Sequence, residues 1–190
     1  MGKLTFIYGT MGSAKTANAL MQYFELKNHY SNAVLMKPSI DNRDGDNIIK
    51  SRIGLEEKAV VFLPSDDLNG IMKFKGIGNI IIDEAQFCTE EQINTLKNIT
   101  CNTKINIYCY GLKTDFTTHL FEGSKRLIEV ADVLKELDMT CNNCENKAEV
   151  NARLDKNKNI VKDGNQIIIG GNDLYIPLCY KCWLNNITKR

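Results

Sequence analysis

A glycine-rich loop between an apolar run and a helix-like stretch restricts the fold more than any other feature of this sequence. The apolar run covers residues 4–8, and the helical pattern extends from Lys15 to about Leu26. The loop between them reads Gly9-Thr10-Met11-Gly12-Ser13-Ala14-Lys15-Thr16. A strand, a glycine-rich turn and Lys-Thr at a helix start form the context of a phosphate-binding P-loop. We therefore predict that backbone N–H groups of residues 9–16 face the phosphates of a nucleotide.

Three side chains of the loop bear on that prediction. Lys15 is expected to reach the β- and γ-phosphates, and the Thr16 hydroxyl is expected to face a magnesium ion. Ala14 stands where the usual pattern has glycine, so its Cβ is expected to crowd the approach of phosphate to the backbone. The alternative is a chance glycine-rich turn before an ordinary helix.

Length and composition indicate one globular domain with a small addition. The chain has 190 residues, of which 43% are hydrophobic and 25% charged, and its net charge is +1. Such a balance gives no field that would indicate nucleic acid or a membrane surface as a partner. No apolar run approaches the ~20 residues of a spanning helix, and the first residues lack a signal-peptide pattern. We expect a cytoplasmic protein.

Apolar runs of strand length alternate with helical stretches over the first 137 residues. We expect strands at 3–8, 33–36, 59–63, 79–84 and 104–110, and helices at 15–26, 89–96 and 123–137. Continuous apolar runs are typical of parallel strands covered on both faces, and the alternation is typical of βα units. The pattern predicts an α/β fold with a mostly parallel sheet flanked by helices.

The run at 79–82 is followed by two carboxylates, Asp83 and Glu84. Asp83 is predicted to help hold magnesium at the carboxyl end of the strand, in line with Thr16. Because adjacent strand residues point to opposite sides, Glu84 is expected to face an attacking nucleophile. The alternative is that both carboxylates cap the helix expected near Thr89.

Polar turns follow the second expected strand and contain Arg43. In an open α/β sheet, ligands are contacted at this edge, so Arg43 is a candidate phosphate ligand. The residues by themselves favour a solvated loop arginine instead.

Four of the seven cysteines form two C-x-x-C pairs, separated by 34 residues: Cys141, Cys144, Cys179 and Cys182. Without secretory signals this pattern indicates metal rather than disulfides, and it predicts a zinc site with four cysteine ligands. Four thiolates leave no open coordination position, so the role is structural. The composition changes near Asp138, and we expect a nucleotide-binding domain at 1–137 and a zinc-binding unit at 138–190 that needs its metal to fold.

In this order the motifs resemble the type II, zinc-containing thymidine kinase family over nearly the whole chain. The markers are the P-loop, 37–43, 51–54, Asp83-Glu84-Ala85-Gln86-Phe87, 110–116, both cysteine pairs and 169–175. The resemblance implies a RecA-like P-loop fold and transfer of the γ-phosphoryl group of ATP to the 5′-hydroxyl of thymidine. It implies that Glu84 is the general base, and that Lys15, Asp83 and magnesium stabilise the transferred group.

The resemblance also assigns residues to two binding sites. The phosphate site adds Asp41, Asn42, Arg43, Asp83 and Gln86 to the P-loop. The nucleoside site takes side chains from Met11, Phe87, Leu112, Phe116, Phe121 and Tyr175. It also takes main-chain groups from a loop, here called the lasso (residues 166–171), that includes Gln166, Ile167, Ile168, Ile169 and Gly170. Zinc is expected to anchor both ends of the lasso.

The resemblance also implies a homotetramer and feedback inhibition by dTTP. Asn151 stands where some relatives have Thr close to the base, and its role is open.

Two competing interpretations remain. One is a P-loop ATPase with a zinc ribbon acting on nucleic acid, in which Glu84 would activate water. Balanced charge and the lack of a basic stripe disfavour it. The other is a nucleotide-binding protein without activity, suggested by Ala14. The phosphate acceptor distinguishes them.

Overall fold

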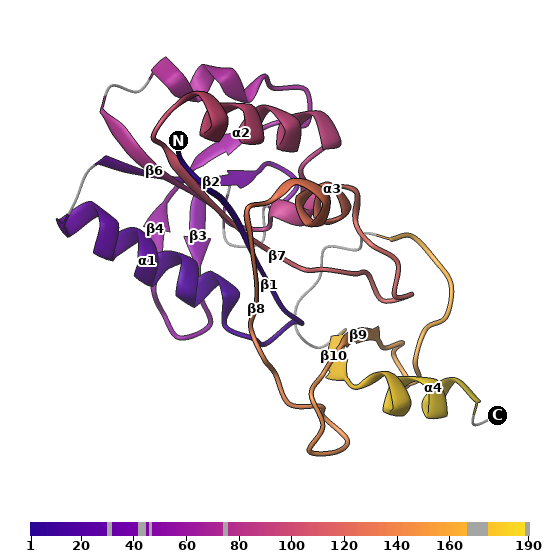
Figure 1. The fold of residues 1–190 in the computed structure, drawn as a ribbon. Helices are drawn as coiled ribbons and strands as arrows, with labels where there is room; N and C mark the ends of the chain where they lie inside the picture. The colour runs from indigo at the N-terminus through magenta and orange to yellow at the C-terminus, as the bar shows by residue number, and fades with distance from the viewer. Residues whose placement is uncertain (30–31, 42–44, 46, 74–75, 167–174, 189–190) are drawn as a thin grey trace.

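The computed structural model describes residues 1–29, 32–41, 45, 47–73, 76–166 and 175–188 (Figure 1). Its centre is a six-stranded sheet in which every neighbouring pair of strands is parallel. The strands of this sheet are β1 (Leu4–Tyr8), β2 (Asn32–Pro38), β5 (Val60–Phe62), β6 (Ile77–Ile82), β7 (Asn106–Gly111) and β8 (Val133–Glu136). They lie in the order β5-β2-β6-β7-β1-β8. The predicted α/β fold with a parallel sheet is confirmed.

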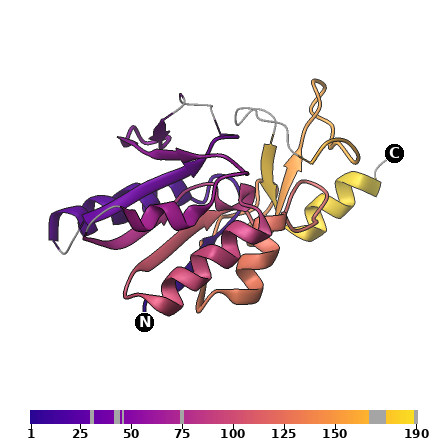
Figure 2. The same ribbon diagram turned by 90° about the horizontal axis from the view of Figure 1, so that it is seen from above.

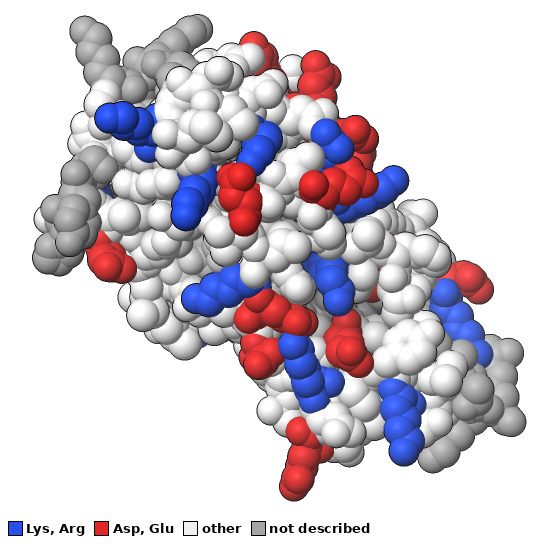
Figure 3. All heavy atoms as spheres, viewed as in Figure 1, with Lys and Arg blue, Asp and Glu red and all other residues white. Residues whose placement is uncertain are grey.

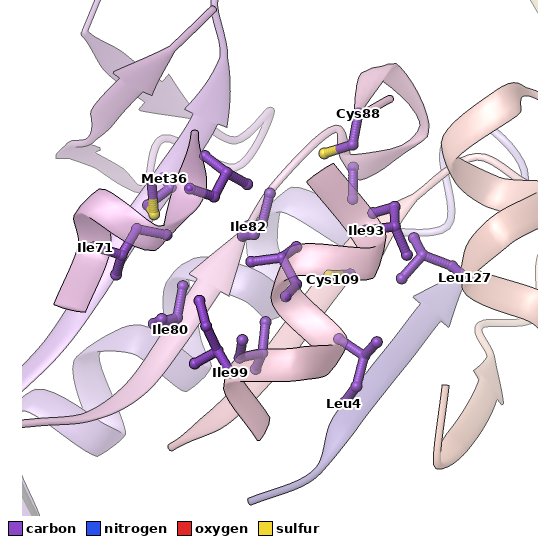
Figure 4. Packing of buried hydrophobic residues seen from close by; sticks show 14 of the residues in the cluster. Leu4, Met36, Ile71, Ile80, Ile82, Cys88, Ile93, Ile99, Cys109 and Leu127 are labelled. Atoms are coloured by element: carbon purple, nitrogen blue, oxygen red, sulfur yellow. The ribbon is translucent and has the colours of Figure 1, made fainter. Parts of the chain in front are cut away.

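Helices cover both faces of this sheet (Figures 1 and 2). One face carries α1 (Lys15–His29), and the other carries α2 (Glu90–Asn102) and α3 (Glu122–Val130). The strand interiors are apolar on both sides: Ile80 and Ile82 pack in the core under α2, whereas Ile81 packs in the core under α1. Figure 4 shows Ile93 and Ile99 of α2 among the side chains of the first core. Burial on both faces explains the continuous apolar runs.

Parallel register brings the strand ends to one edge of the sheet. Tyr8 pairs with Gly111 and Ile82 pairs with Cys109. The loops that follow β1, β6 and β7 therefore leave the sheet side by side. In a sheet of this type that edge is where ligands bind.

Shorter elements complete the chain. They are β3 (Ile48–Lys50), β4 (Glu56–Lys58), the 3-10 turns η1 (Leu68–Lys73) and η2 (Ala85–Phe87), β9 (Val150–Arg153), β10 (Tyr175–Leu178) and α4 (Tyr180–Thr188). β3 and β4 form an antiparallel hairpin, and β9 and β10 form a second antiparallel pair. β9, β10 and α4 lie together beyond one end of the large sheet (Figures 1 and 2).

The helix expected at 123–137 is wrong in its second half. α3 ends at Val130, and 133–136 form β8, which pairs with β1. Asp132 redirects the chain, because its N–H donates to the Leu4 carbonyl and its carboxylate accepts the Leu4 N–H. Leu134 therefore lies half-exposed on an edge strand. The spacing of apolar residues had indicated a helical face, but pairing with β1 decided the conformation.

In the C-terminal part the sequence predicts short strands around 148–154 and 166–169. The first is confirmed as β9, whereas Gln166 lies in a bend and residues 167–169 lie outside the described residues. The second cysteine pair spans the start of α4, a helix that sequence patterns did not indicate. No helix in the described part of the chain is long and apolar enough to cross a membrane.

Candidate active site

The loop between β1 and α1 has the bends of a P-loop. Gly12 and Ala14 adopt positive φ angles of 88° and 59°. Gly9 is needed for close packing, because a Cβ there would lie 2.5 Å from Ser13 Oγ. The Ser13 N–H donates to the Thr10 carbonyl at 3.2 Å and tightens the turn. The loop leads directly into the N-terminus of α1, where unpaired N–H groups favour an anion.

Ala14 occupies a left-handed backbone conformation that favours glycine. We expect Ala14→Gly to remove strain on the order of 1 kcal/mol and to lower the KM for ATP, because the Cβ next to the phosphates is removed. The check is the melting temperature together with the KM for ATP. The matched control, Ala19→Gly inside α1, should lower stability by about 1 kcal/mol. A higher KM for ATP in Ala14→Gly would contradict the steric argument.

Lys15 is turned back onto the loop. Its Nζ donates to the Thr10 carbonyl at 2.8 Å and lies 3.5 Å from Ser13 Oγ. The residue is only 9% exposed, so its charge is held against the loop and away from solvent. A phosphate would offer the ammonium a charged acceptor, and such hydrogen bonds are stronger than those to a neutral oxygen.

Asp83 and Thr16 meet at the edge of the sheet, as the sequence predicted. The Thr16 hydroxyl donates to the Asp83 carboxylate, and the Asp83 N–H donates to the Met36 carbonyl at 3.0 Å. Asp83 is 3% exposed. Burial, reinforced by the neighbouring charge of Glu84, raises the pKa of Asp83 to about 7. A hydroxyl and a carboxylate in contact form an oxygen-rich pair suited to magnesium.

The raised pKa of Asp83 makes a prediction about stability without magnesium. The unfolded chain releases this proton near pH ~4, whereas the folded protein keeps it up to about pH 7. The free energy of unfolding should therefore fall as pH rises through this window. Asp83→Asn removes the penalty, and we expect it to stabilise the metal-free protein at pH 8 by as much as about 4 kcal/mol, and hardly at pH 4. Thermal melts over pH measure this, with the exposed Asp67→Asn as control. Equal shifts at both pH values would contradict the assignment.

Glu84 is held in an unusual conformation. Its φ of 53° lies in the left-handed region, which is uncommon and costly for a residue with a side chain. The side chain of Gln86 joins Glu84 to Leu112. The Gln86 Nε2 donates to the Glu84 carboxylate, and the Gln86 Oε1 accepts the Leu112 N–H at 3.0 Å. Gln86 is 2% exposed. Its amide therefore fixes Glu84 relative to the chain that follows β7.

Asp83 and Glu84 lie in a bend after β6, and the cap of α2 is a different residue. β6 ends at Ile82, so the bend after the strand, rather than strand alternation, separates Asp83 from Glu84. The helix α2 is capped by Thr89, which forms a capping box with Gln92. Glu84 precedes η2 and makes no side-chain capping bond to it. The Glu84 carboxylate is thus not used as a helix cap.

Aromatic residues follow Glu84 and β7 in the chain. The rings of Phe87 and Phe121 meet edge to face, with centroids 5.8 Å apart. Phe116 is 2% exposed. The Leu112 carbonyl accepts the Ser124 hydroxyl at 2.6 Å, which joins the chain after β7 to α3, the helix that begins after Phe121. Apolar rings of this kind are suited to pack against a flat base.

Asn151 of β9 joins the C-terminal part to the P-loop. Its Oδ1 accepts the Met11 N–H at 2.7 Å, and its Nδ2 donates to the Thr114 carbonyl at 3.3 Å. It is 3% exposed. The role left open by the sequence is therefore to connect the loop after β1 with the loop after β7.

Sequence reasoning missed Arg153, the last residue of β9. Its side chain is 4% exposed and its guanidinium lies 3.7 Å from the ring centroid of Phe116. Its Nε donates to the Tyr175 hydroxyl at 2.9 Å. The available signal was a charged residue at the end of an expected strand, which seldom is buried unless it has partners.

The four paired cysteines come together as predicted. Their Sγ atoms all lie within 4.8 Å of one another. Cys144 Sγ lies 3.6 Å from those of Cys179 and Cys182. The Asn143 and Cys182 N–H groups each point at a cysteine sulfur at 3.4 Å. Such N–H groups favour thiolates, so the cluster can hold a metal ion.

Comparison with known proteins agrees with this geometry. The sequence model of the family described as thymidine kinase matches residues 2–183. The chain belongs to the thymidine kinase family. The thymidine kinase of Zymomonas mobilis is 39% identical over all of both chains. That of Enterobacteria phage T4 is 38% identical over 100% of this chain and 99% of its own.

Other matches are more distant. The thymidine kinase of Haemophilus influenzae is 37% identical over 94% of both chains. The solved structure of the ATPase DotB of Legionella pneumophila aligns with 77% of this chain and 43% of its own at 16% identity. Its TM-score is 0.43, too low to bear on function.

Several residues that the resemblance to thymidine kinases assigned lie outside the described residues: Asn42, Arg43, Ile167, Ile168, Ile169 and Gly170. Asp41 is described and is 8% exposed at the same edge of the sheet. Gln166 donates from Nε2 to the Asp115 carboxylate at 2.9 Å. Its side chain therefore binds the loop after β7.

Proposed function

We propose that this chain transfers the γ-phosphoryl group of ATP to the 5′-hydroxyl of thymidine. Membership of the thymidine kinase family supports this activity. The observation that supports it within the site is the contact between Thr16 of the P-loop and Asp83, with Glu84 next in the chain. A phosphate cradle, an oxygen pair for a cation and a carboxylate for a proton are thereby adjacent.

In the proposed reaction Glu84 accepts the proton of the 5′-hydroxyl. An electron pair of the 5′-oxygen then forms a bond to the γ-phosphorus. At the same time the bond between the γ-phosphorus and the β–γ bridging oxygen breaks, and ADP leaves with the electrons of that bond. Lys15 and the loop N–H groups stabilise charge on the phosphoryl oxygens. Thr16 and Asp83 would hold magnesium, which when bound neutralises phosphate charge. Asp41, Asn42 and Arg43 are proposed to contact phosphate from the loop after β2.

The nucleoside is proposed to lie beside Glu84, against the aromatic residues. Met11, Phe87, Leu112, Phe116, Phe121 and Tyr175 are the proposed contacts. Main-chain groups of residues 166–170 are proposed to read the pyrimidine edge. The position of Asn151 supports this arrangement, because it binds the Met11 N–H of the P-loop and the Thr114 carbonyl of the loop after β7, and so holds these two loops together.

The metal held by the four cysteines is proposed to be zinc. With Zn–S bonds of about 2.3 Å, a tetrahedral site has sulfurs about 3.8 Å apart, close to the 3.6 Å separations here. Four sulfurs leave no position for a substrate, so the proposed role is structural. We further propose that 138–190 form a separate zinc-binding unit attached to a nucleotide-binding domain at 1–137.

The distribution of charge disfavours the competing ATPase interpretation. On the face shown in Figure 3, Lys and Arg are interspersed with Asp and Glu, without a basic stripe. Nucleic-acid binding normally needs such a stripe. A homotetramer and feedback inhibition by dTTP are also proposals, and they rest on the resemblance. A cytoplasmic location is a proposal as well.

Phosphate transfer from labelled ATP tests the proposed function. The protein is given magnesium and one acceptor at a time: thymidine, deoxycytidine, deoxyguanosine or none. We expect label on thymidine and little on the others. Release of free phosphate at the same rate with every acceptor would favour the ATPase. No transfer and no release would favour the inactive protein.

A further inference from the structure

Arg153 carries a positive charge into a buried position among residues that the proposed nucleoside site uses. It is 4% exposed. Among the described residues no carboxylate forms an ion pair with it; its partners are neutral. Burying an unpaired charge is costly, so all of its donors need acceptors. A buried apolar residue would avoid that cost. The groups that surround the guanidinium therefore indicate what the charge does at this position.

Each of the three guanidinium nitrogens donates a hydrogen bond to a neutral acceptor. Nε donates to the Tyr175 hydroxyl at 2.9 Å. One terminal nitrogen donates to the Asn165 carbonyl at 2.8 Å, and the other donates to the Gln166 carbonyl at 3.1 Å. These acceptors flank 167–174 on both sides in the sequence. One planar group thus joins the two described ends of that segment.

Two aromatic rings complete the environment. The guanidinium carbon lies 3.7 Å from the ring centroid of Phe116 and 5.3 Å from that of Tyr175. Planar guanidinium groups stack on aromatic faces, and lysine cannot reproduce that contact together with a fork of hydrogen bonds. The same side chain therefore contacts both rings and the chain at 165–166.

We propose that Arg153 is the positioning residue of the nucleoside pocket. It fixes Phe116, Tyr175 and the chain at 165–166 in one arrangement, without touching the phosphates or the reacting oxygen. Its neighbour on the same face of β9 is Asn151, because residues two apart in a strand share a face. Asn151 binds the P-loop instead. Two residues of β9 thus hold different parts of the site: Arg153 positions the nucleoside pocket, and Asn151 positions the phosphate loop. This inference rests on the proposed function for the identity of the ligand.

The experiment compares the full chain with Arg153→Met and Arg153→Lys. Calorimetry measures the affinity for thymidine and, separately, for a non-hydrolysable ATP analogue. We expect both variants to bind thymidine at least about tenfold more weakly and the ATP analogue within about twofold of the original chain. Lysine keeps the charge but not the planar fork, so it should not rescue binding. Arg126→Met, a substitution of a partly exposed arginine on α3, is the control and should change neither affinity.

Endoproteinase Lys-C provides a readout that needs no nucleoside. We expect cleavage after Lys162, three residues before Asn165, to be at least about fivefold faster in Arg153→Met than in the original chain. If Arg153→Met does not fold, Arg153→Lys decides the question. Thymidine affinity like the original in either variant, or equal weakening of both ligands, would overturn the inference. If the original chain binds no thymidine, the proposed function fails, whereas the cleavage rates still decide whether Arg153 positions this chain segment.

Discussion

Glu84→Gln is expected to lower the rate of thymidine phosphorylation by about 10²- to 10⁴-fold, the usual contribution of a general base. The amide cannot accept the proton of the 5′-hydroxyl. It keeps the size of the side chain and still offers an oxygen to the Gln86 Nε2, so the local structure should persist. Affinities for ATP and thymidine are expected to stay within about threefold, because both ligands are held mainly by other residues.

Single-turnover kinetics with labelled ATP measure this effect separately from binding. Glu91→Gln on the exposed side of α2 provides the same chemical change outside the site and should behave like the original chain. Activity above about a tenth of the original in Glu84→Gln would exclude Glu84 as the base. Asp83, the adjacent carboxylate, would then be the next candidate for the base. A loss of ATP affinity of the same size would instead indicate a role in holding the nucleotide.

Removal of the metal from the four-cysteine cluster is the second change with a large expected effect. Structural zinc contributes about 10 kcal/mol or more to small metal-bound units. The core beside the cysteines is small, with Ala152, Leu178 and few other buried side chains. β9 carries both Asn151 and Arg153, so loosening this unit should disturb the nucleoside site. We expect thymidine affinity to fall at least about tenfold, while an ATP analogue still binds.

The measurement uses a chelator under reducing conditions, followed by calorimetry with each ligand. Elemental analysis should first find one zinc per chain, and zinc added back should restore thymidine binding. Cys144→Ser should reproduce the loss, whereas Cys101→Ser, at an exposed cysteine outside the cluster, should not. Unchanged thymidine affinity in metal-free protein would refute the anchoring role. A different metal in stoichiometric amount would refute zinc.

Local patterns were sufficient for five of the six strands of the central sheet, all except β8, and for the parts of the site that lie next to strand ends. Ile80, Ile81 and Ile82 read as a buried strand because both faces are covered, and the carboxylates that follow it had to emerge at the same edge as the P-loop. Parallel register makes that edge shared. The cysteine spacing indicated a metal cluster because only closure in space was needed, and the sulfurs do converge.

Residues whose state depends on a distant partner could not be read in this way. The apolar spacing at 123–137 fits a helix, and only the pairing of β8 with β1 ends α3 at Val130. The left-handed backbone of Glu84 likewise depends on its surroundings, including the contact to Gln86. For β8 a long-range pairing outweighs local preference, and Gln86 is itself held by the Leu112 N–H, 26 residues further along the chain.

The sequence by itself determined the phosphate loop, the carboxylate pair, the cysteine cluster and the class of fold, since each is indicated by short motifs or by local patterns along the chain. Only the tertiary structure decided what β9 does. Asn151 binds Met11, which lies 140 residues earlier in the chain. Arg153 contacts Phe116, which precedes it in the chain, and Tyr175, which follows it. No periodicity encodes such meetings, because a buried polar side chain takes its role from whichever groups folding brings within hydrogen-bond distance.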